Sequence, residues 1–142
     1  MPTKILYSTT ARATGGRDGT AGTTDGRFSV TLATPSELGG NGQGNNPEQL
    51  FASGYAACFL GAMKFAATQN KTLPRVPTDA TVEATVSFGP RSDKGFGLAV
   101  RLVVTLPGVD REAAKALVNE ADTICPYSHA VRGNISVDLN VA

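Results

Sequence analysis

The stretch from Asn46 to Asn70 constrains the fold more than any other, because it reads as one long helix that is apolar on nearly every side. Asn46 is a good N-cap, Pro47 suits the first helical position, and Glu48 places a carboxylate in the first turn. Large apolar residues are interspersed with small ones, and Cys58 lies near the middle. A helix that is apolar all round is buried all round. We therefore predict a central helix that the rest of the molecule surrounds, with a thiol inside.

The composition limits the class of protein. A length of 142 residues favours one domain covering residues 1–142. A net charge of +1 argues against nucleic acid or a membrane surface as the main partner. The long helix carries Glu48 and Lys64, so we expect no membrane span. The N-terminus lacks the continuous apolar region of a signal peptide, which predicts a cytoplasmic location.

Short alternating segments predict strands on both sides of the long helix. We expect strands at residues 4–13, 20–24, 27–33, 81–89, 97–106 and 135–141, a second helix from Asp110 to Ile124, and short connections at 35–45 and 127–132. The glycine-rich loop at 35–45 has no phosphate-binding spacing. Because no strand–helix–strand repeat occurs, we predict mainly antiparallel sheets and the α+β class.

Two cysteines, Cys58 and Cys125, are the candidates for chemistry. In a reducing compartment, a cysteine pair more often forms a transient catalytic disulfide than a permanent one. The helix dipole acts only over the end turns and burial raises a thiol pKa, so a reactive Cys58 needs a nearby cation. His129 and Arg17, which sits in a glycine-flanked turn, are the candidates. A partly buried arginine needs a carboxylate with matching geometry, and Glu48 is the obvious one.

The spacing of Glu48 and Cys58 favours a dimer. The two residues are ten positions apart, or about 15 Å along a helix axis, so they cannot easily meet one partner within one straight helix. In a two-fold dimer with antiparallel helices, Glu48 of one copy lies level with Cys58 of the other, and the helices cross near Ser53 and Gly54. Gly54 and Gly61 each cost about 1 kcal/mol in a helix, which close approach of another backbone would explain. We expect a homodimer with composite sites.

Cys125 can meet Cys58 if the second helix packs on the first. One ionised buried thiol with a second thiol beside it is the layout of a thiol peroxidase, in which a sulfenic acid is resolved as a disulfide. Simpler interpretations are that both cysteines are small buried hydrophobes, that Arg17 is solvated, and that Glu48 only complements the helix dipole. One histidine and two distant cysteines give no metal-ligand spacing, so we expect no metal.

Three stretches, GGRDG, NPEQLFASGYAACF and CPYSHAVRGNISV, resemble the organic hydroperoxide resistance (Ohr) group of the Ohr/OsmC family. The resemblance covers essentially the whole chain. It implies an intertwined homodimer, with sheets wrapped around long central helices and two sites at the subunit interface. By position, it implies that Cys58 is the peroxidatic cysteine, Cys125 the resolving cysteine, Arg17 the thiolate-stabilising arginine and Glu48 the glutamate that holds this arginine.

The resemblance also implies an activity and a reductant. It implies reduction of organic hydroperoxides, including fatty-acid hydroperoxides, in preference to hydrogen peroxide. The electrons would come from dihydrolipoyl groups of lipoylated proteins, and no cofactor is implied. Two alternatives stay open: an OsmC-type peroxidase with a different substrate range, and a non-enzymatic dimer that binds an apolar ligand or senses oxidants.

Overall fold

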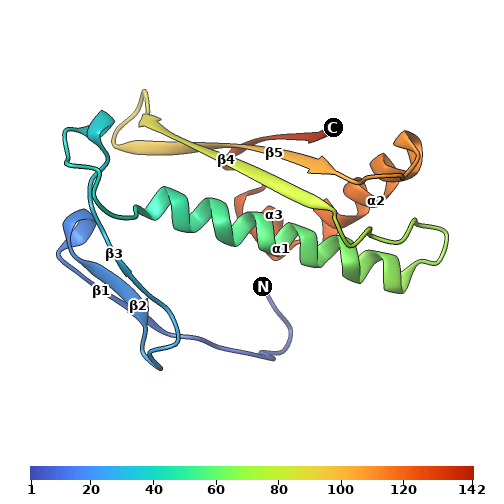
Figure 1. Ribbon diagram of the computed structural model, residues 1–142, viewed down its shortest axis with the longest axis horizontal. Coiled ribbons are helices and arrows are strands. Elements are labelled where there is room, and N and C mark those ends of the chain that lie inside the picture. The colour runs from blue at the N-terminus through green and yellow to red at the C-terminus, as the bar shows by residue number, and fades with distance from the viewer. The chain divides into compact units, whose positions relative to one another are not determined.

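The computed structural model describes residues 1–142, which group into two compact units, Met1–Leu50 and Phe51–Ala142. Figure 1 traces the order of the elements along the chain. The single domain expected from the length stays a prediction.

The first unit is built on a small antiparallel sheet. Its strands are β1 (Ala11–Thr14), β2 (Thr20–Thr23) and β3 (Ser29–Thr31), in the order β1-β2-β3, with 3₁₀ turns at Gly16–Asp18 and Ser36–Leu38. The predicted strand at residues 4–13 began too early, because residues 4–9 lie outside the sheet and leave Ile5, Leu6 and Tyr7 exposed, and Thr10 contributes only its carbonyl, which accepts the N–H of Thr24. The third strand is also shorter than predicted, since Leu32 and Ala33 bridge to Asn45 instead.

The second unit packs helices against a three-stranded sheet. The sheet has the order β4 (Thr81–Pro90), β5 (Phe96–Thr105) and β6 (Ser136–Val141). β4 and β5 are antiparallel, whereas β6 returns parallel to β5 after α2 (Arg111–Ile124) and α3 (Pro126–Val131). The predicted α+β class with mainly antiparallel strands is therefore confirmed. The prediction of a bare connection at residues 127–132 was wrong, because Pro126 starts a short helix there.

The long helix α1 (Pro47–Gln69) begins as predicted. Asn46 Oδ1 accepts the backbone N–H of Gln49, and Gln49 Oε1 accepts that of Asn46. This reciprocal capping box satisfies two backbone donors that a helix start otherwise leaves unpaired. Asp110 caps α2 in a similar way, by accepting the N–H groups of Glu112 and Ala113.

One face of α1 forms the core of the second unit. Tyr55, Phe59 and Met63 are fully buried, together with Leu102 of β5 and Leu117 of α2. Figure 1 shows α1 running along the sheet of β4 to β6, with α2 and α3 close by. By length and composition alone α1 could cross a membrane. The same length and composition also occur in core helices of proteins that cross no membrane.

The opposite face of α1 differs from the prediction of burial all round. Ala57 and Gly61 are exposed, and Phe65 keeps 53% of its surface accessible. The reason is geometric, because the sheet and the other helices of one chain cover only one side of α1. The second unit by itself therefore leaves an apolar face of α1 uncovered.

Candidate functional site

The two cysteines lie side by side in the second unit. The thiol of Cys125 points at Cys58 with 3.6 Å between the sulfur atoms, and neither forms a disulfide. Cys125 is fully buried and Cys58 partly buried. A disulfide bond is about 2.05 Å long, so a shift of about 1.5 Å would join them. The structure thus brings together the two predicted thiols, which are 67 residues apart in the sequence.

Pro126 explains where Cys125 is placed. A residue before proline is disfavoured in the helical region, and Cys125 has the extended backbone angles φ −60° and ψ 119°. Its N–H still bonds to Ala121 O as the last turn of α2, and its C=O accepts the N–H of His129 in α3. Cys125 is therefore a one-residue joint between two helices, aimed inward at α1. The side chain of His129 is exposed on α3.

The ionisation of Cys58 is governed by opposing influences. Burial raises the pKa of the Cys58 thiol, while the backbone N–H of Tyr127 donates to the sulfur and lowers this pKa. The net pKa is raised. The effect of burial is predicted from the sequence, whereas the Tyr127 contact is not. The signal for it was Pro126, since proline at the first helical position predicts N–H groups of a new helix directly after Cys125.

Gly54 makes room for Tyr127. A Cβ atom at Gly54 would lie 3.1 Å from Tyr127 Oη and 3.2 Å from Cε2. The close neighbour of Gly54 within the chain is therefore an aromatic ring of α3, where the sequence suggested a backbone. At Gly61 a Cβ atom would meet nothing within 4 Å.

Arg17 and Glu48 form the predicted ion pair in the first unit. Arg17 Nη1 and Nη2 donate to the two carboxylate oxygens of Glu48 at 2.8 and 2.6 Å. Such two-point contacts hold a guanidinium in one plane. The hydrogen bonds from Arg17 hold the pKa of Glu48 below its usual range, and Glu48 raises the pKa of Arg17. Both groups thus stay charged across the physiological pH range.

The backbone around Arg17 is set by glycine and by Asp18. Gly15 and Gly16 have φ values of 69° and 61°, which favour glycine. A Cβ atom at Gly19 would overlap the carbonyl of Thr14. Asp18 then ties the turn to Thr34, whose backbone N–H and hydroxyl both donate to its carboxylate at 2.9 Å. The turn therefore presents Arg17 in a defined conformation.

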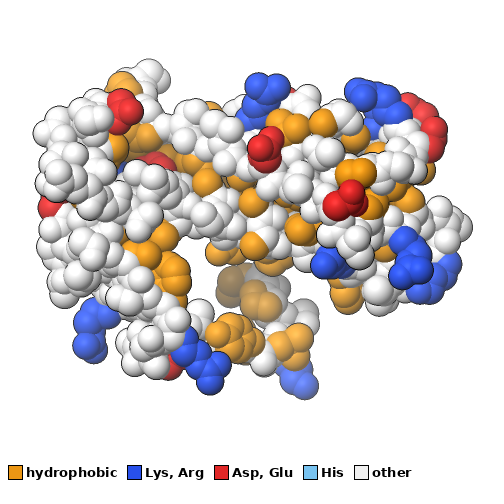
Figure 2. All heavy atoms as spheres, in the orientation of Figure 1, with side chains coloured by type: hydrophobic (Ala, Val, Ile, Leu, Met, Phe, Trp, Pro, Cys, Tyr) orange, Lys and Arg blue, Asp and Glu red, His pale blue; other side chains and the backbone are white.

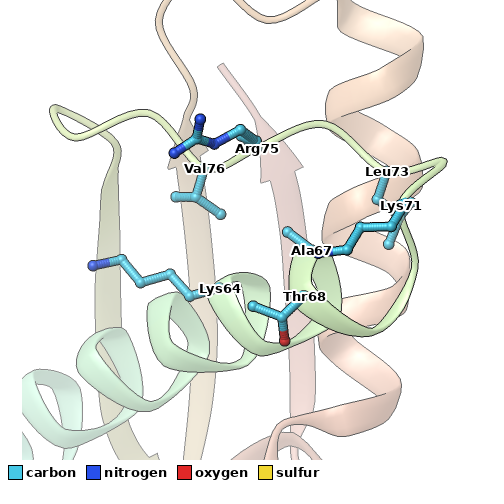
Figure 3. Close-up of a pocket in the computed structure, with 7 residues that line it drawn as sticks. All are labelled: Lys64, Ala67, Thr68, Lys71, Leu73, Arg75 and Val76. Carbon is cyan, nitrogen blue, oxygen red and sulfur yellow. The ribbon is translucent and has the colours of Figure 1, made fainter.

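A large cavity of the second unit lies away from the cysteines. It measures about 600 Å³ and is lined mainly by the C-terminal turns of α1 and the loop that follows. Figure 3 shows the side chains of Lys64 and Arg75 extending toward the same side, and basic side chains gather over the same end of α1 in Figure 2. Neither cysteine lines this cavity, so it adds nothing to the thiol site.

The chain is similar to known proteins over nearly its whole length. Residues 40–140 match the family model described as OsmC-like protein. The chain is 48% identical to the organic hydroperoxide resistance protein of Xanthomonas axonopodis pv. citri, over 99% of this chain and 98% of that one.

Solved structures agree with this result. A crystal structure from Legionella pneumophila, described as an organic hydroperoxide resistance protein OsmC, matches with TM-score 0.91 and 46% identity over 98% of this chain and 99% of that chain. The organic hydroperoxide resistance protein OhrB of Bacillus subtilis matches with TM-score 0.85 and 40% identity over 97% and 100% of the two chains. The chain therefore belongs to the OsmC-like family and, within it, to the organic hydroperoxide resistance group.

Proposed function

We propose that this chain is a thiol peroxidase that reduces organic hydroperoxides to alcohols. The observation that carries the proposal is the 3.6 Å separation of the Cys58 and Cys125 sulfur atoms. Relatives named for organic hydroperoxide resistance support a role in handling these peroxides. Two free thiols this close form a disulfide with little rearrangement, which is what the second step of such a reaction needs.

The proposed reaction has three steps. The Cys58 thiolate attacks the distal oxygen of ROOH, which breaks the O–O bond and gives ROH, after protonation, and Cys58 sulfenic acid. The Cys125 thiol then attacks the sulfenic sulfur, releasing water and forming the Cys58–Cys125 disulfide. A dithiol, for which we propose a dihydrolipoyl group on a protein, reduces this disulfide by exchange and becomes a disulfide itself. No metal or organic cofactor takes part.

The first step needs a cation, because burial raises the pKa of Cys58. We assign this cation to Arg17, oriented by Glu48. The charge would lower the pKa of the thiol and stabilise the negative charge that develops on the leaving oxygen. In our proposal the Arg17–Glu48 pair of one copy completes the site at Cys58 of a second copy.

The exposed face of α1 supports the proposed homodimer. Ser53 and Ala57 are spaced by four residues on this exposed face, and Gly61 and Phe65 continue it toward the C-terminal end of α1. Rows of residues spaced by four form the ridges and grooves through which helices pack. In the register that brings the distant Glu48 level with Cys58, a second antiparallel copy of α1 would cover the part of this face around Ser53 and Ala57, while Gly61 lies beyond the start of the partner helix.

A steady-state assay with dihydrolipoamide and an alkyl hydroperoxide tests the function. We expect turnover with the alkyl hydroperoxide, slower turnover with hydrogen peroxide, and none for Cys58→Ser. Faster turnover of hydrogen peroxide would favour the OsmC-type alternative. If the wild-type protein forms its disulfide but turns over neither peroxide, a redox sensor would be favoured.

A further inference from the structure

Two sets of polar contacts connect α3 to neighbouring helices, one to α1 and the other to α2. Tyr55 Oη of α1 is hydrogen-bonded to Ser128 Oγ of α3 at 2.8 Å. Arg132, directly after α3, donates through Nη2 to the carbonyl and to a carboxylate oxygen of Asp122 in α2, both at 2.8 Å. We call these two contacts the α3 clasp.

The Tyr55–Ser128 contact is the buried half of the clasp. Tyr55 is fully buried, and Ser128, at 2% exposure, is the one polar residue of the chain in the buried interior besides the tyrosine hydroxyl. A buried hydroxyl that loses its partner is strongly penalised, so this bond resists separation of α3 from α1. Burial also raises the pKa of Tyr55, so the phenol keeps its proton.

Packing alone does not hold α3 on this side. A cavity of about 220 Å³ lies beside the clasp, and Tyr55, Asp122, Ser128 and Arg132 help to line it. On its other side α3 is packed, because the Tyr127 ring lies 6.1 Å from Phe51 and 5.8 Å from Tyr55, measured between ring centres. The clasp therefore fixes α3 where continuous side-chain contact is missing.

We propose that the α3 clasp positions Cys125 for disulfide formation with Cys58, which makes Tyr55, Ser128, Asp122 and Arg132 positioning residues. The proposal rests on the disulfide step of the proposed function. In that step the Cys125 sulfur attacks the Cys58 sulfenic acid, the S–O bond breaks, and water leaves with the Cys125 proton. Holding the thiols 3.6 Å apart before the reaction raises their effective concentration.

The test is the thiol–disulfide equilibrium of the full chain in glutathione redox buffers. This equilibrium gives the effective concentration of the Cys58–Cys125 pair. We expect Tyr55→Phe and Asp122→Asn each to lower it about tenfold, which equals about 30 mV for a two-electron couple. Tyr7→Phe, at an exposed tyrosine, is the matched control and should leave it unchanged. An unchanged or higher value in the folded clasp variants would overturn the proposal.

A double variant separates positioning from stability. Tyr55→Phe leaves Ser128 unpaired, whereas Tyr55→Phe combined with Ser128→Ala removes both hydroxyls and leaves no buried donor without a partner. We expect the double variant to regain part of the unfolding midpoint lost by Tyr55→Phe, while its effective concentration stays low. Recovery of both quantities together would mean that the clasp is merely structural.

A second readout follows the peroxide reaction. A slower disulfide step leaves the sulfenic acid exposed to a second hydroperoxide, which converts it to sulfinic acid. Clasp variants should therefore still consume the first equivalent of hydroperoxide but accumulate several-fold more sulfinic acid per equivalent consumed, detected by mass spectrometry. Equal sulfinic acid in wild type and variants would contradict the clasp. If the wild-type protein does not react with the hydroperoxide, the proposed function is refuted. The equilibrium in glutathione buffers would still test whether the clasp positions Cys125.

Discussion

Arg17 and Glu48 are 31 residues apart in the sequence, yet two guanidinium nitrogens of Arg17 meet both carboxylate oxygens of Glu48 at 2.8 and 2.6 Å. A contact at two points fixes the plane of the guanidinium, which a single contact would not do. The pair is partly exposed, with 34% of the Arg17 side chain and 17% of the Glu48 side chain accessible. Its value to the molecule is therefore orientation more than stability, since exposed ion pairs contribute little to folding.

Loss of the carboxylate should weaken the reactivity of Cys58. Glu48→Gln keeps the side-chain shape but removes the charge that orients Arg17, so we expect the pKa of Cys58 to rise and kcat/KM at pH 7 to fall about tenfold, the effect of one pKa unit. The pH profile of Cys58 alkylation measures this directly. Arg27→Ala, at a turn where the side chain is 89% exposed, is the control and should change neither quantity. An alkylation profile that is identical in Glu48→Gln and wild type would remove Glu48 from the site.

The same pair predicts how stability depends on pH. Arg17 lowers the pKa of Glu48 in the folded state, so the stabilisation is complete above the ordinary glutamate pKa of about 4.3 and is lost as the pH falls through the lowered value. Wild type should therefore exceed Glu48→Gln by up to about 1 kcal/mol at pH 7, the upper range for exposed pairs, and by less near pH 3. Urea unfolding at both pH values gives the two differences. A larger difference in acid would contradict the sign.

Removal of the second thiol should separate the two chemical steps. Cys125→Ser keeps Cys58 and should reduce one equivalent of hydroperoxide per chain, after which the sulfenic acid persists because no neighbouring thiol resolves it. Turnover with dihydrolipoamide should fall by at least about tenfold, since recycling through a disulfide is blocked. Trapping of the sulfenic acid with dimedone, followed by mass spectrometry, measures the intermediate. Full steady-state turnover in Cys125→Ser would show that Cys125 does not resolve the sulfenic acid.

Two glycines of α1 offer a matched pair of substitutions. Alanine gains up to about 1 kcal/mol over glycine in a helix interior. Gly61→Ala should show this gain, because its Cβ meets nothing within 4 Å, whereas Gly54→Ala pushes on the Tyr127 ring. We expect Gly54→Ala to be about 1 kcal/mol less stable than Gly61→Ala in urea unfolding. The rate at which an added reagent alkylates Cys58 should also differ between Gly54→Ala and Gly61→Ala, because the N–H of Tyr127 bonds to the Cys58 sulfur. Equal behaviour of the two variants would contradict the contact.

Local signals account for what could be predicted from the sequence. Asn46 and Asp110 mark helix starts by their capping chemistry, and alternation marks β4, β5 and β6 closely. The Arg17–Glu48 pair followed from charge and a glycine-flanked turn. These features depend on neighbours in the sequence or on strict chemical complementarity, so one sequence suffices to propose them.

Features that depend on which other elements pack against a helix or strand were not predicted from the sequence. The burial of α1 on one face only, and the short β1, depend on which strands are present to cover them, and periodicity does not encode this. The helix α3 was missed because its six residues are too few to show a helical pattern. Its contacts with Cys58 and Tyr55 could therefore not be anticipated, although Pro126 was a usable signal.

The reaction of the reduced chain with one equivalent of an alkyl hydroperoxide tests the central claim most directly. Quenching with an alkylating reagent and mass spectrometry would follow both thiols while chromatography follows the alcohol. We predict one alcohol per chain, the loss of both thiols, and a single bond joining Cys58 to Cys125. Alcohol formation at the wild-type rate by Cys58→Ser, or full consumption of the hydroperoxide with both thiols intact, would contradict the account.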